Sequence, residues 1–291
     1  MSVINTNVNS LVAQNAVKVN ARALSSAMEQ LSTGKRINGS KDDAAGLSIS
    51  QIMTAQIRGL NQAVRNANDG VSLLQTADGA MIEQSNMMQR MRELAVQASS
   101  DTVTPSQKTY LDKEYQALLT EIDRISTATQ WNGKNLLDGL GGNAGAGTYV
   151  FQVGANSATG VTDQSVSVAI GKASVAGGGI YADLLATTVS DGATATTTVK
   201  AAEAITALDK SIQAANDKRA SIGAGINRLT YAADNLSNIS MNTAASRSRI
   251  EDTDYAQAST ELARTQIIQQ AATAMLAQAN QSPQSVLALL K

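Results

Sequence analysis

Apolar residues recur at helical spacing near both ends of the chain. They follow one another in steps of three or four residues between Val8 and Leu31, and again between Ala258 and Ala279. A stripe this narrow is typical of a coiled-coil seam, in which each helix covers the apolar face of another. Neither helix can bury its stripe alone, so the pattern predicts that the two chain ends pair with each other. The first stripe comprises Val8, Val12, Ala16, Val19, Ala23, Ala27 and Leu31, and the second Ala258, Leu262, Thr265, Ile268, Ala272, Met275 and Ala279.

Long uninterrupted helices are predicted between these ends, because the chain has only two prolines. The segment GKRINGSKDDAAG (34–46) interrupts the first helix with glycines and charges, and a second helix is expected over about 44–99. A helix of this length is roughly 80 Å long. The sequence TPSQ (104–107) is typical of a helix start, with proline in the first turn and a capping glutamine. That third helix is expected to end near Thr127, and helical spacing returns at about Thr198.

The middle of the chain has a different composition. More than half of the 21 glycines lie between Gly139 and Gly192. Apolar residues alternate over 149–153 and again over 166–170, which predicts a β-hairpin spanning 147–170. The following segment, 171–197, is rich in Gly, Ala, Ser and Thr, and is expected to form an exposed loop with short hairpins.

The fold class expected from these elements is mainly α. Helices run out from one chain end and back to the other, which predicts a long antiparallel helical rod with a terminal coiled coil and a small β-hairpin region at its distal end. The expected domains are a terminal coiled-coil domain of 1–44 and 251–291, a rod domain of 45–170 and 198–250 that contains the hairpin 147–170, and a short variable outer segment of 171–197.

Composition limits the chemistry that this chain can perform. Histidine and cysteine are both absent, which removes most transition-metal sites, thiol chemistry and the commonest general base. The net charge of −1 offers no basic field for nucleic acid. No apolar run is long enough to span a bilayer, and no cleavable secretory signal is visible. The sequence therefore predicts no enzyme, no cofactor, no nucleic-acid binding and no membrane insertion. The paired glycines of IGAGIN (222–227) are interpreted as a site of close helix packing.

Several long motifs resemble bacterial flagellin. At the N-terminal side these are MSVINTNVNSLVAQNAV, LSTGKRINGSKDDAAGLSIS and NANDGVSLLQTADGAM, and at the C-terminal side ASRSRIEDTDYA and QAATAMLAQANQSPQSVLALLK. The resemblance covers about 1–170 and 205–291. It implies a structural subunit that polymerises into the helical flagellar filament for swimming motility. It also implies an extracellular location, type III export without a cleaved signal peptide, and contacts with a flagellar export chaperone and with cap and junction proteins.

The resemblance further implies that the terminal segments form the filament core. Because their alanine-rich seams are weak, we expect both termini to be disordered in the free monomer and to become ordered on polymerisation. A second stripe on the C-terminal helix, Ile267, Ala271 and Ala274, indicates a further neighbour, although a single intramolecular partner is an open alternative. The expected filament-core residues are Val8, Leu11, Val12, Val19, Leu24, Leu31, Leu262, Ile267, Ile268, Met275, Leu276, Leu287 and Leu290.

The stretch QRMRELAVQASS (89–100) carries two further predictions. Helical spacing places Met88, Met91, Ala95 and Ala98 on an inner face and Arg90 and Leu94 on an outer face. The family resemblance implies that vertebrate Toll-like receptor five binds this outer face of the monomer, with Leu94 as an apolar anchor. The receptor-binding residues implied are Arg90, Leu94 and Glu114, together with Gln89, Glu93 and Gln97.

Four of the nine methionines fall between Met81 and Met91. Thioether side chains pack adaptably, so this run indicates either a contact surface of the filament or ordinary core filling.

Three alternatives to a filament subunit remain. A flagellar hook–filament junction protein would share similar terminal helices but would not grow long filaments alone. An enzyme would need a catalytic insertion in the short, histidine-free middle region. A generic helical adhesin would not polymerise.

Overall fold

The computed structural model describes residues 6–142, 147–155, 164–175, 179–184, 187–188 and 197–288, with the side chains of 197–199 and 282–288 not described. The chain forms two compact units, each built from both halves of the sequence. We call Met1–Gln56 with Met241–Lys291 the terminal unit, and Ile57–Ser240 the central unit. The division between units falls inside two long helices, whereas the sequence placed it at the helix breaks near 44 and 251.

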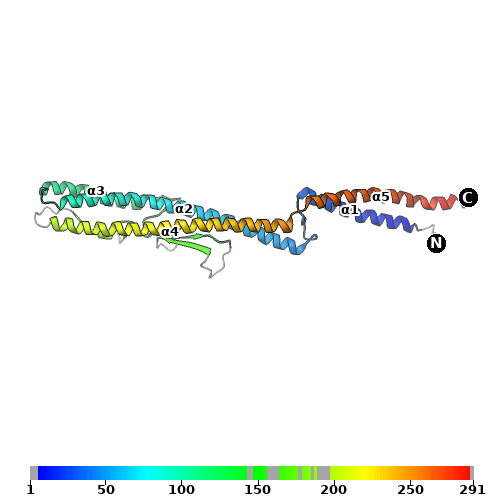
Figure 1. Ribbon diagram of the computed structural model, residues 1–291, viewed down its shortest axis with the longest axis horizontal. Coiled ribbons are helices and arrows are strands. Elements are labelled where there is room, and N and C mark those ends of the chain that lie inside the picture. The colour runs from blue at the N-terminus through cyan, green and yellow to red at the C-terminus, as the bar shows by residue number, and fades with distance from the viewer. Residues whose placement is uncertain are drawn as a thin grey trace. The chain divides into compact units, whose positions relative to one another are not determined.

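The prediction of a mainly α fold is confirmed. Five helices account for most of the described residues, and the strands there form two short antiparallel hairpins (Figure 1). The helices are α1 (Val8–Thr33), α2 (Ala44–Ala98), α3 (Pro105–Ala128), α4 (Thr197–Glu251) and α5 (Tyr255–Ala288).

Local sequence signals fix where these helices begin and end. The Asn7 side chain accepts a hydrogen bond from the Ser10 amide and caps α1, which ends at Gly34 in the left-handed conformation. The Asp43 carboxylate accepts from the Gly46 amide at 2.8 Å and begins α2. At the start of α3 the Thr104 amide donates to Gln107 Oε1 at 2.9 Å, as the sequence predicted.

In the terminal unit, α1 and α5 lie side by side and run antiparallel (Figure 1). The Asn7 amide group donates to the Ala279 carbonyl, and the Asn20 amide group donates to the Thr265 carbonyl. Positions early in α1 thus meet positions late in α5. The predicted pairing of the two chain ends is confirmed.

The seam between these helices differs from the predicted one. On α1 it consists of buried and half-buried residues in alternating steps of three and four, and it includes the polar residues Ser10 and Asn20. Val8, Val12 and Val19 of the predicted stripe are exposed instead. On α5, Gln269 and Leu276 replace the predicted Ile268 and Met275. The seam comprises Ser10, Ala13, Val17, Asn20, Leu24, Ala27 and Leu31 on α1, and Ala258, Leu262, Thr265, Gln269, Ala272, Leu276 and Ala279 on α5.

Hydrogen bonds across the helix pair explain this choice of seam. Ser10 Oγ donates to Asn280 Oδ1 at 2.7 Å, and Asn20 Nδ2 donates to the Thr265 carbonyl at 2.8 Å and to Gln269 Oε1 at 2.9 Å. A buried amide is tolerated when its donors are satisfied, and a buried polar pair of this kind fixes the register of a coiled coil. The spacing of apolar residues in the sequence could not predict these hydrogen bonds.

The two helix breaks of the terminal unit are tied together. The Arg36 amide donates to the Glu251 carbonyl at 2.7 Å, and the Thr253 amide donates to the Gly34 carbonyl at 3.0 Å. The Arg36 guanidinium reaches the Ile250 carbonyl at the C-terminus of α4, where a cation is favourable. Lys35 and Glu251 form an ion pair at 2.5 Å. The connection between α1 and α2 and the connection between α4 and α5 therefore hold each other in place.

In the central unit, α2, α3 and α4 pack lengthwise (Figure 1). Arg92 of α2 pairs with Asp209 of α4, and Asp78 further back along α2 pairs with Arg219 further along α4. Residue numbers rise on one helix as they fall on the other, so these two helices are antiparallel.

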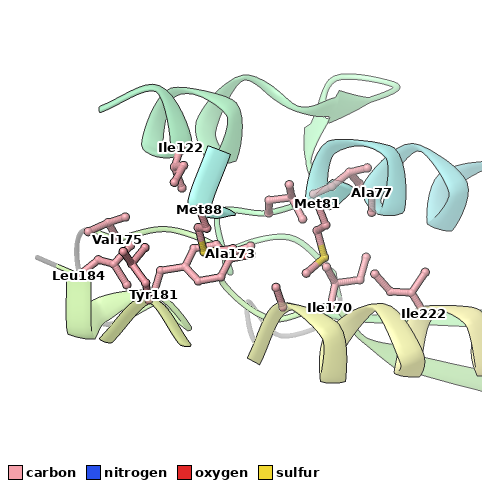
Figure 2. Packing of buried hydrophobic residues seen from close by; sticks show 14 of the residues in the cluster. Ala77, Met81, Met88, Ile122, Ile170, Ala173, Val175, Tyr181, Leu184 and Ile222 are labelled. Carbon is pink, nitrogen blue, oxygen red and sulfur yellow. The ribbon is translucent and has the colours of Figure 1, made fainter. Parts of the chain in front are cut away.

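The core of the central unit contains both helical residues and the segment that follows the second hairpin. Met81, Met88, Ile122, Val175, Tyr181 and Leu184 are fully buried; Met88 lies near Val175, Tyr181 and Leu184, and Met81 lies near Ile170 and Ile222 (Figure 2). Tyr181 and Leu184 belong to a short 3-10 turn region around η3 (Ala182–Leu184). The segment 171–197 was predicted to be an exposed outer segment. That prediction is wrong for its described residues that line the core, such as Val175, Tyr181 and Leu184. The reason is that its scattered apolar residues belong to the same core cluster as residues of α2, α3 and α4.

A buried glutamine links this segment to the helices. Gln84 Nε2 donates to the carbonyls of Ile122 and Ala173, both at 3.1 Å, and Gln84 Oε1 accepts from the Tyr181 hydroxyl at 3.3 Å. Ile122 lies in α3, whereas Ala173 and Tyr181 lie in the segment that follows β4. One satisfied amide on α2 therefore holds α2, α3 and that segment together.

The two hairpins follow α3. β1 (Gln130–Trp131) and β2 (Lys134–Asn135) are joined by Asn132 and Gly133, both with positive φ, as is typical of an Asn-Gly hairpin turn. β3 (Thr148–Gln152) pairs with β4 (Ser165–Ala169), with Tyr149 opposite Val168 and Phe151 opposite Val166. The predicted hairpin is confirmed where it is described, and its 156–163 connection lies outside the described residues.

The β3–β4 hairpin packs against glycines of the long helices. A Cβ at Gly70 of α2 would lie 2.8 Å from the Phe151 ring, and a Cβ at Gly225 of α4 would lie 2.6 Å from Val168. The interpretation of IGAGIN as a site of close helix packing is confirmed in part at Gly225: a Cβ there would lie 3.4 Å from Leu74 Cδ1 of α2, but its nearest neighbour is the strand residue Val168. A Cβ at its neighbour Gly223 would meet nothing within 4 Å among the described atoms.

Candidate assembly and receptor surfaces

The terminal unit exposes a large amount of apolar side chain. Val12 of α1 is 65% exposed and Ile267 of α5 is 67% exposed, values far above those of core residues. A groove of about 590 Å³ lies between the two helices. It is lined by Asn9, Val12, Ala13, Ala16, Ala272, Met275, Gln278 and Ala279. Contiguous apolar surface of this kind marks a site of interaction with another chain.

The expected filament-core residues divide into two sets. Leu24, Leu31, Leu262 and Leu276 are half-buried in the seam between α1 and α5. The others with a described side chain are exposed, and we call them the free stripe: Val8, Leu11, Val12, Val19, Ile267, Ile268 and Met275. The side chain of Leu287 is not described, and Leu290 lies outside the described residues.

A charged network covers the outer face where α2 meets α3. Arg90 Nε and Nη2 donate to Glu114 Oε1 at 3.1 and 3.0 Å, and Arg90 Nη1 donates to Glu93 Oε2 at 3.0 Å. These hydrogen bonds, first to Glu93 and then to Glu114, raise the pKa of Arg90 above its ordinary value. Three of the residues expected to bind a receptor are thus joined in one exposed cluster, with exposed Gln89 and Gln97 on the same helix.

Leu94 does not lie on this face. Its side chain is 1% exposed and belongs to the core of the central unit, with Met91, Ala95 and Ala98. The prediction of Leu94 as an exposed apolar anchor is wrong, because α2 is covered over a wider arc than one stripe. The prediction that Met88, Met91, Ala95 and Ala98 face inward is confirmed.

Sequence reasoning missed an exposed apolar residue in a groove next to this network, which shares Glu93 with it. Val96 is 49% exposed and lines a shallow groove of about 510 Å³ with Gln89, Arg92, Glu93 and Gln97. Arg92 Nε donates to Asp209 Oδ1 of α4 at 2.7 Å and forms one side of it. Val96 is three residues from Glu93 and four from Arg92, so helical spacing alone could have indicated that it shares their face.

The described residues offer little for metal or membrane chemistry. Among them, no three acidic, histidine or cysteine side chains come together as metal ligands. No helix in the described part of the chain combines the length and apolarity needed to cross a bilayer.

Antiparallel helices that return both chain ends to one coiled coil, with an apolar stripe left uncovered, define a helical structural protein suited to association. Family models give the particular class. The bacterial flagellin N-terminal helical region matches residues 4–141, and the bacterial flagellin C-terminal helical region matches residues 205–290.

Known relatives extend this match over the whole chain. A flagellin of Halalkalibacterium halodurans is 43% identical over 289 residues, covering 99% of this chain and 100% of the relative. A flagellin of Bacillus subtilis is 42% identical over 308 residues, covering 99% of each chain. Among solved structures, a Bacillus cereus flagellin aligns with a TM-score of 0.47 and 31% identity over 63% of this chain and 94% of that one.

The chain belongs to the bacterial flagellin family. It is therefore a structural protein of the extracellular flagellar filament, which is a polymer of such subunits and serves motility.

Proposed function

We propose that copies of this chain assemble through the free stripe of the terminal unit. The observation that carries the proposal is the exposure of Val12, Ile267 and Met275 beside a seam that α1 and α5 already bury against each other. Each fully buried aliphatic side chain contributes about 1.5–3 kcal/mol, so several free-stripe residues per copy supply a strong driving force for association. A helical filament needs unlike faces of neighbouring copies to meet without closing a ring.

The test replaces free-stripe residues and measures polymerisation. Val12→Gln and Ile267→Gln are expected to raise the critical monomer concentration at least about tenfold each, because each places an unpaired amide in an apolar contact. Val12→Ile and Ile267→Leu serve as matched controls and keep assembly. Sedimentation and electron microscopy of the polymer measure the outcome. Normal filaments from both glutamine variants would contradict the proposal.

The same experiment separates a filament subunit from a hook–filament junction protein. We propose that the purified wild-type chain grows long filaments without other components, which a junction protein does not do. Failure to elongate under conditions that polymerise the Bacillus subtilis relative would favour the junction role. We assign the chain no enzymatic activity and no cofactor.

We also propose that the subunit leaves the cell through type III flagellar export without a cleaved signal peptide, with an export chaperone and with cap and junction proteins as partners. The support is membership of the flagellin family. Mass determination of the protein recovered from filaments tests this. Loss of an N-terminal segment longer than the initiator methionine would contradict it.

Recognition of the monomer by Toll-like receptor five is a second candidate function. The support is the exposed cluster of Arg90, Glu93 and Glu114, with Gln89 and Gln97 beside it. Its charged groups are preorganised by mutual hydrogen bonds, which limits the entropy lost on binding. We propose that Leu94 supports this surface from beneath and that Val96 is the apolar residue that a receptor contacts.

A receptor reporter assay with purified monomer tests the assignment. Arg90→Ala and Glu114→Ala are expected to lower potency at least about tenfold, because truncated charged hot-spot residues often cost this much. Arg124→Ala is the matched control, since Arg124 is also an exposed arginine and pairs with Glu121 on α3. Equal potency of all three variants would remove the receptor role from this cluster.

A further inference from the structure

The methionines of this chain separate by unit. Met81, Met88 and Met91 of the central unit are fully buried, and Met87 is half-buried. Of the eight methionines that the structure describes, the exposed ones are Met28, Met241 and Met275, and all three belong to the terminal unit. The interpretation of the Met81–Met91 run as a contact surface is therefore wrong, and Figure 2 shows Met81 and Met88 inside the core.

Met275 has the most consequential position of the exposed three. Its side chain is 66% exposed, and it lines the apolar groove between α1 and α5 with Val12, Ala16 and Ala272. Met28 on α1 and Met241 on α4 are also accessible, but neither lines this groove.

Exposed thioethers react with peroxides at the sulfur atom. Hydrogen peroxide transfers one oxygen to sulfur, so the thioether becomes a sulfoxide, the sulfur loses two electrons and the peroxide is reduced to water. The product is polar and a strong hydrogen-bond acceptor. Burying such a group without a donor is unfavourable, and the groove lining is mostly alanine and valine, with the amide side chains of Asn9 and Gln278 as its two polar members.

We propose that Met275 is a reversible oxidation site that controls assembly, and that hydroperoxides are the oxidants that modify it. Oxidation places a sulfoxide in the groove and blocks packing of another copy, so it acts on free monomers and on newly exposed filament ends. A methionine sulfoxide reductase restores the thioether, with a dithiol reductant that supplies two electrons, becomes a disulfide and releases the oxygen as water. The buried methionines of the central unit keep that unit folded under the same conditions. Because the effect acts on contacts between copies, it rests on the assembly proposed above.

The first test is the pattern of oxidation. Monomer is treated with hydrogen peroxide, digested and analysed by mass spectrometry. Sulfoxide is expected at Met28, Met241 and Met275, with at least about tenfold slower reaction at Met81, Met88 and Met91, since reaction requires access of peroxide to sulfur. Assembled filaments are expected to protect Met275. Equal reaction of the buried and exposed sets, or full reactivity of Met275 in filaments, would overturn the assignment.

The second test links the modification to assembly. Wild-type monomer treated with peroxide is expected to show a critical concentration raised about tenfold, and reductase treatment is expected to restore the original value. Met275→Leu removes the oxidisable sulfur from the groove, so its critical concentration is expected to be the same with and without peroxide treatment, whatever its value before treatment. The double variant Met28→Leu with Met241→Leu keeps Met275 and remains sensitive.

The outcomes distinguish this site from the proposed assembly itself. If untreated wild-type chain does not polymerise, the assembly proposal fails. If untreated chain polymerises and fully oxidised chain does so equally well, the oxidation site is wrong while assembly stands. Sensitivity of Met275→Leu equal to wild type also overturns the role of Met275.

Discussion

Leu94 and Val96 are two positions apart on α2 and lie in opposite environments. Leu94 is buried among Met91, Ala95 and Ala98, whereas Val96 lies on the surface beside Arg92 and Glu93. At this part of α2 the buried arc is wide, because α2 packs against more than one neighbour. A narrow apolar stripe predicts which residues lie at the centre of the buried face. It does not predict how wide an arc of the helix neighbouring elements bury.

This contrast gives a direct stability prediction. Leu94→Ala is expected to destabilise the chain by about 2–5 kcal/mol, because it leaves a cavity in a packed core. Val96→Ala is the matched control and is expected to change the free energy of unfolding by no more than about 0.5 kcal/mol. Urea unfolding followed by circular dichroism measures both. Similar small effects would show that Leu94 is not enclosed.

Tyr181 provides a second prediction at the residue scale. Burial raises the pKa of its phenol well above the ordinary value, and its hydroxyl donates to Gln84. An unfolded tyrosine titrates near about 10, so the stabilisation is complete below that pH and is lost as pH rises toward the higher folded value. The free energy of unfolding of the wild type is therefore expected to fall above about pH 10.

The matched comparison uses two conservative variants in alkaline denaturation curves. Tyr181→Phe removes the titrating group and is expected to make the loss of stability above about pH 10 shallower. Tyr231→Phe replaces a tyrosine that is 75% exposed and keeps the wild-type slope. Parallel curves for all three proteins would contradict the role of Tyr181 burial.

At the scale of elements, four glycines of α2 and α4 divide into two that contact the β3–β4 hairpin and two that have open space around them among the described atoms. Gly70 and Gly225 lie against Phe151 and Val168, whereas a Cβ at Gly79 or Gly223 would meet nothing within 4 Å. Glycine weakens a helix, so its presence at the two contact positions is explained by the close approach of the strand, and the open positions have no such explanation among the described contacts.

Alanine substitutions at these four glycines test that distinction. Gly225→Ala and Gly70→Ala are expected to destabilise the chain by about 1–3 kcal/mol, because the new methyl group meets a stiff neighbour. Gly223→Ala and Gly79→Ala are expected to stabilise it by about 0.5–1 kcal/mol through helix propensity. Thermal unfolding of the four variants shows whether the signs divide as stated. Stabilisation by all four would mean that the hairpin is not seated on these helices.

The bounds of helices and strands in this chain are easier to predict from sequence than the side of each helix that is buried. The bounds of α2 and α3 and the pairing of β3 with β4 follow from prolines, caps and alternation. The seam of α1 does not, because Ser10 and Asn20 are buried by hydrogen bonds to α5 that only the paired helices reveal. The inner position of Tyr181 is likewise set by its neighbours in space, since its flanking residues Gly179, Ile180, Ala182 and Asp183 show no regular apolar spacing.

At the scale of the whole molecule, the two units differ in how much they bury. The central unit encloses a large apolar cluster, whereas the terminal unit has a seam made mostly of alanine, small polar residues and half-buried leucines. A long helix with few buried contacts is weakly protected, because tertiary packing supplies most helical stability. We therefore expect the terminal unit to be the part of the chain that contacts with neighbouring copies stabilise.

Limited proteolysis of monomer and filament checks this difference. In the monomer, protease is expected to trim both chain ends and leave a resistant fragment that contains Ile57–Ser240. Filaments are expected to protect the ends, because neighbouring copies cover the free stripe. Analysis of the fragments by mass spectrometry gives the boundaries. Equal resistance of ends and centre in the monomer would contradict ordering on assembly.

The antiparallel helix pairs also constrain where insertions and deletions can occur in this chain. Asn7 meets Ala279 and Asn20 meets Thr265, while Asp78 meets Arg219 and Arg92 meets Asp209, so α1 keeps a fixed register with α5 and α2 with α4. An insertion or deletion in α1 or α2 shifts every later pair, unless the returning helix gains or loses the same number of residues. Viable length variants should therefore carry compensating changes in both halves of the sequence. Segments between Ala128 and Thr197 have no such counterpart among these pairs, so single insertions are expected to accumulate there.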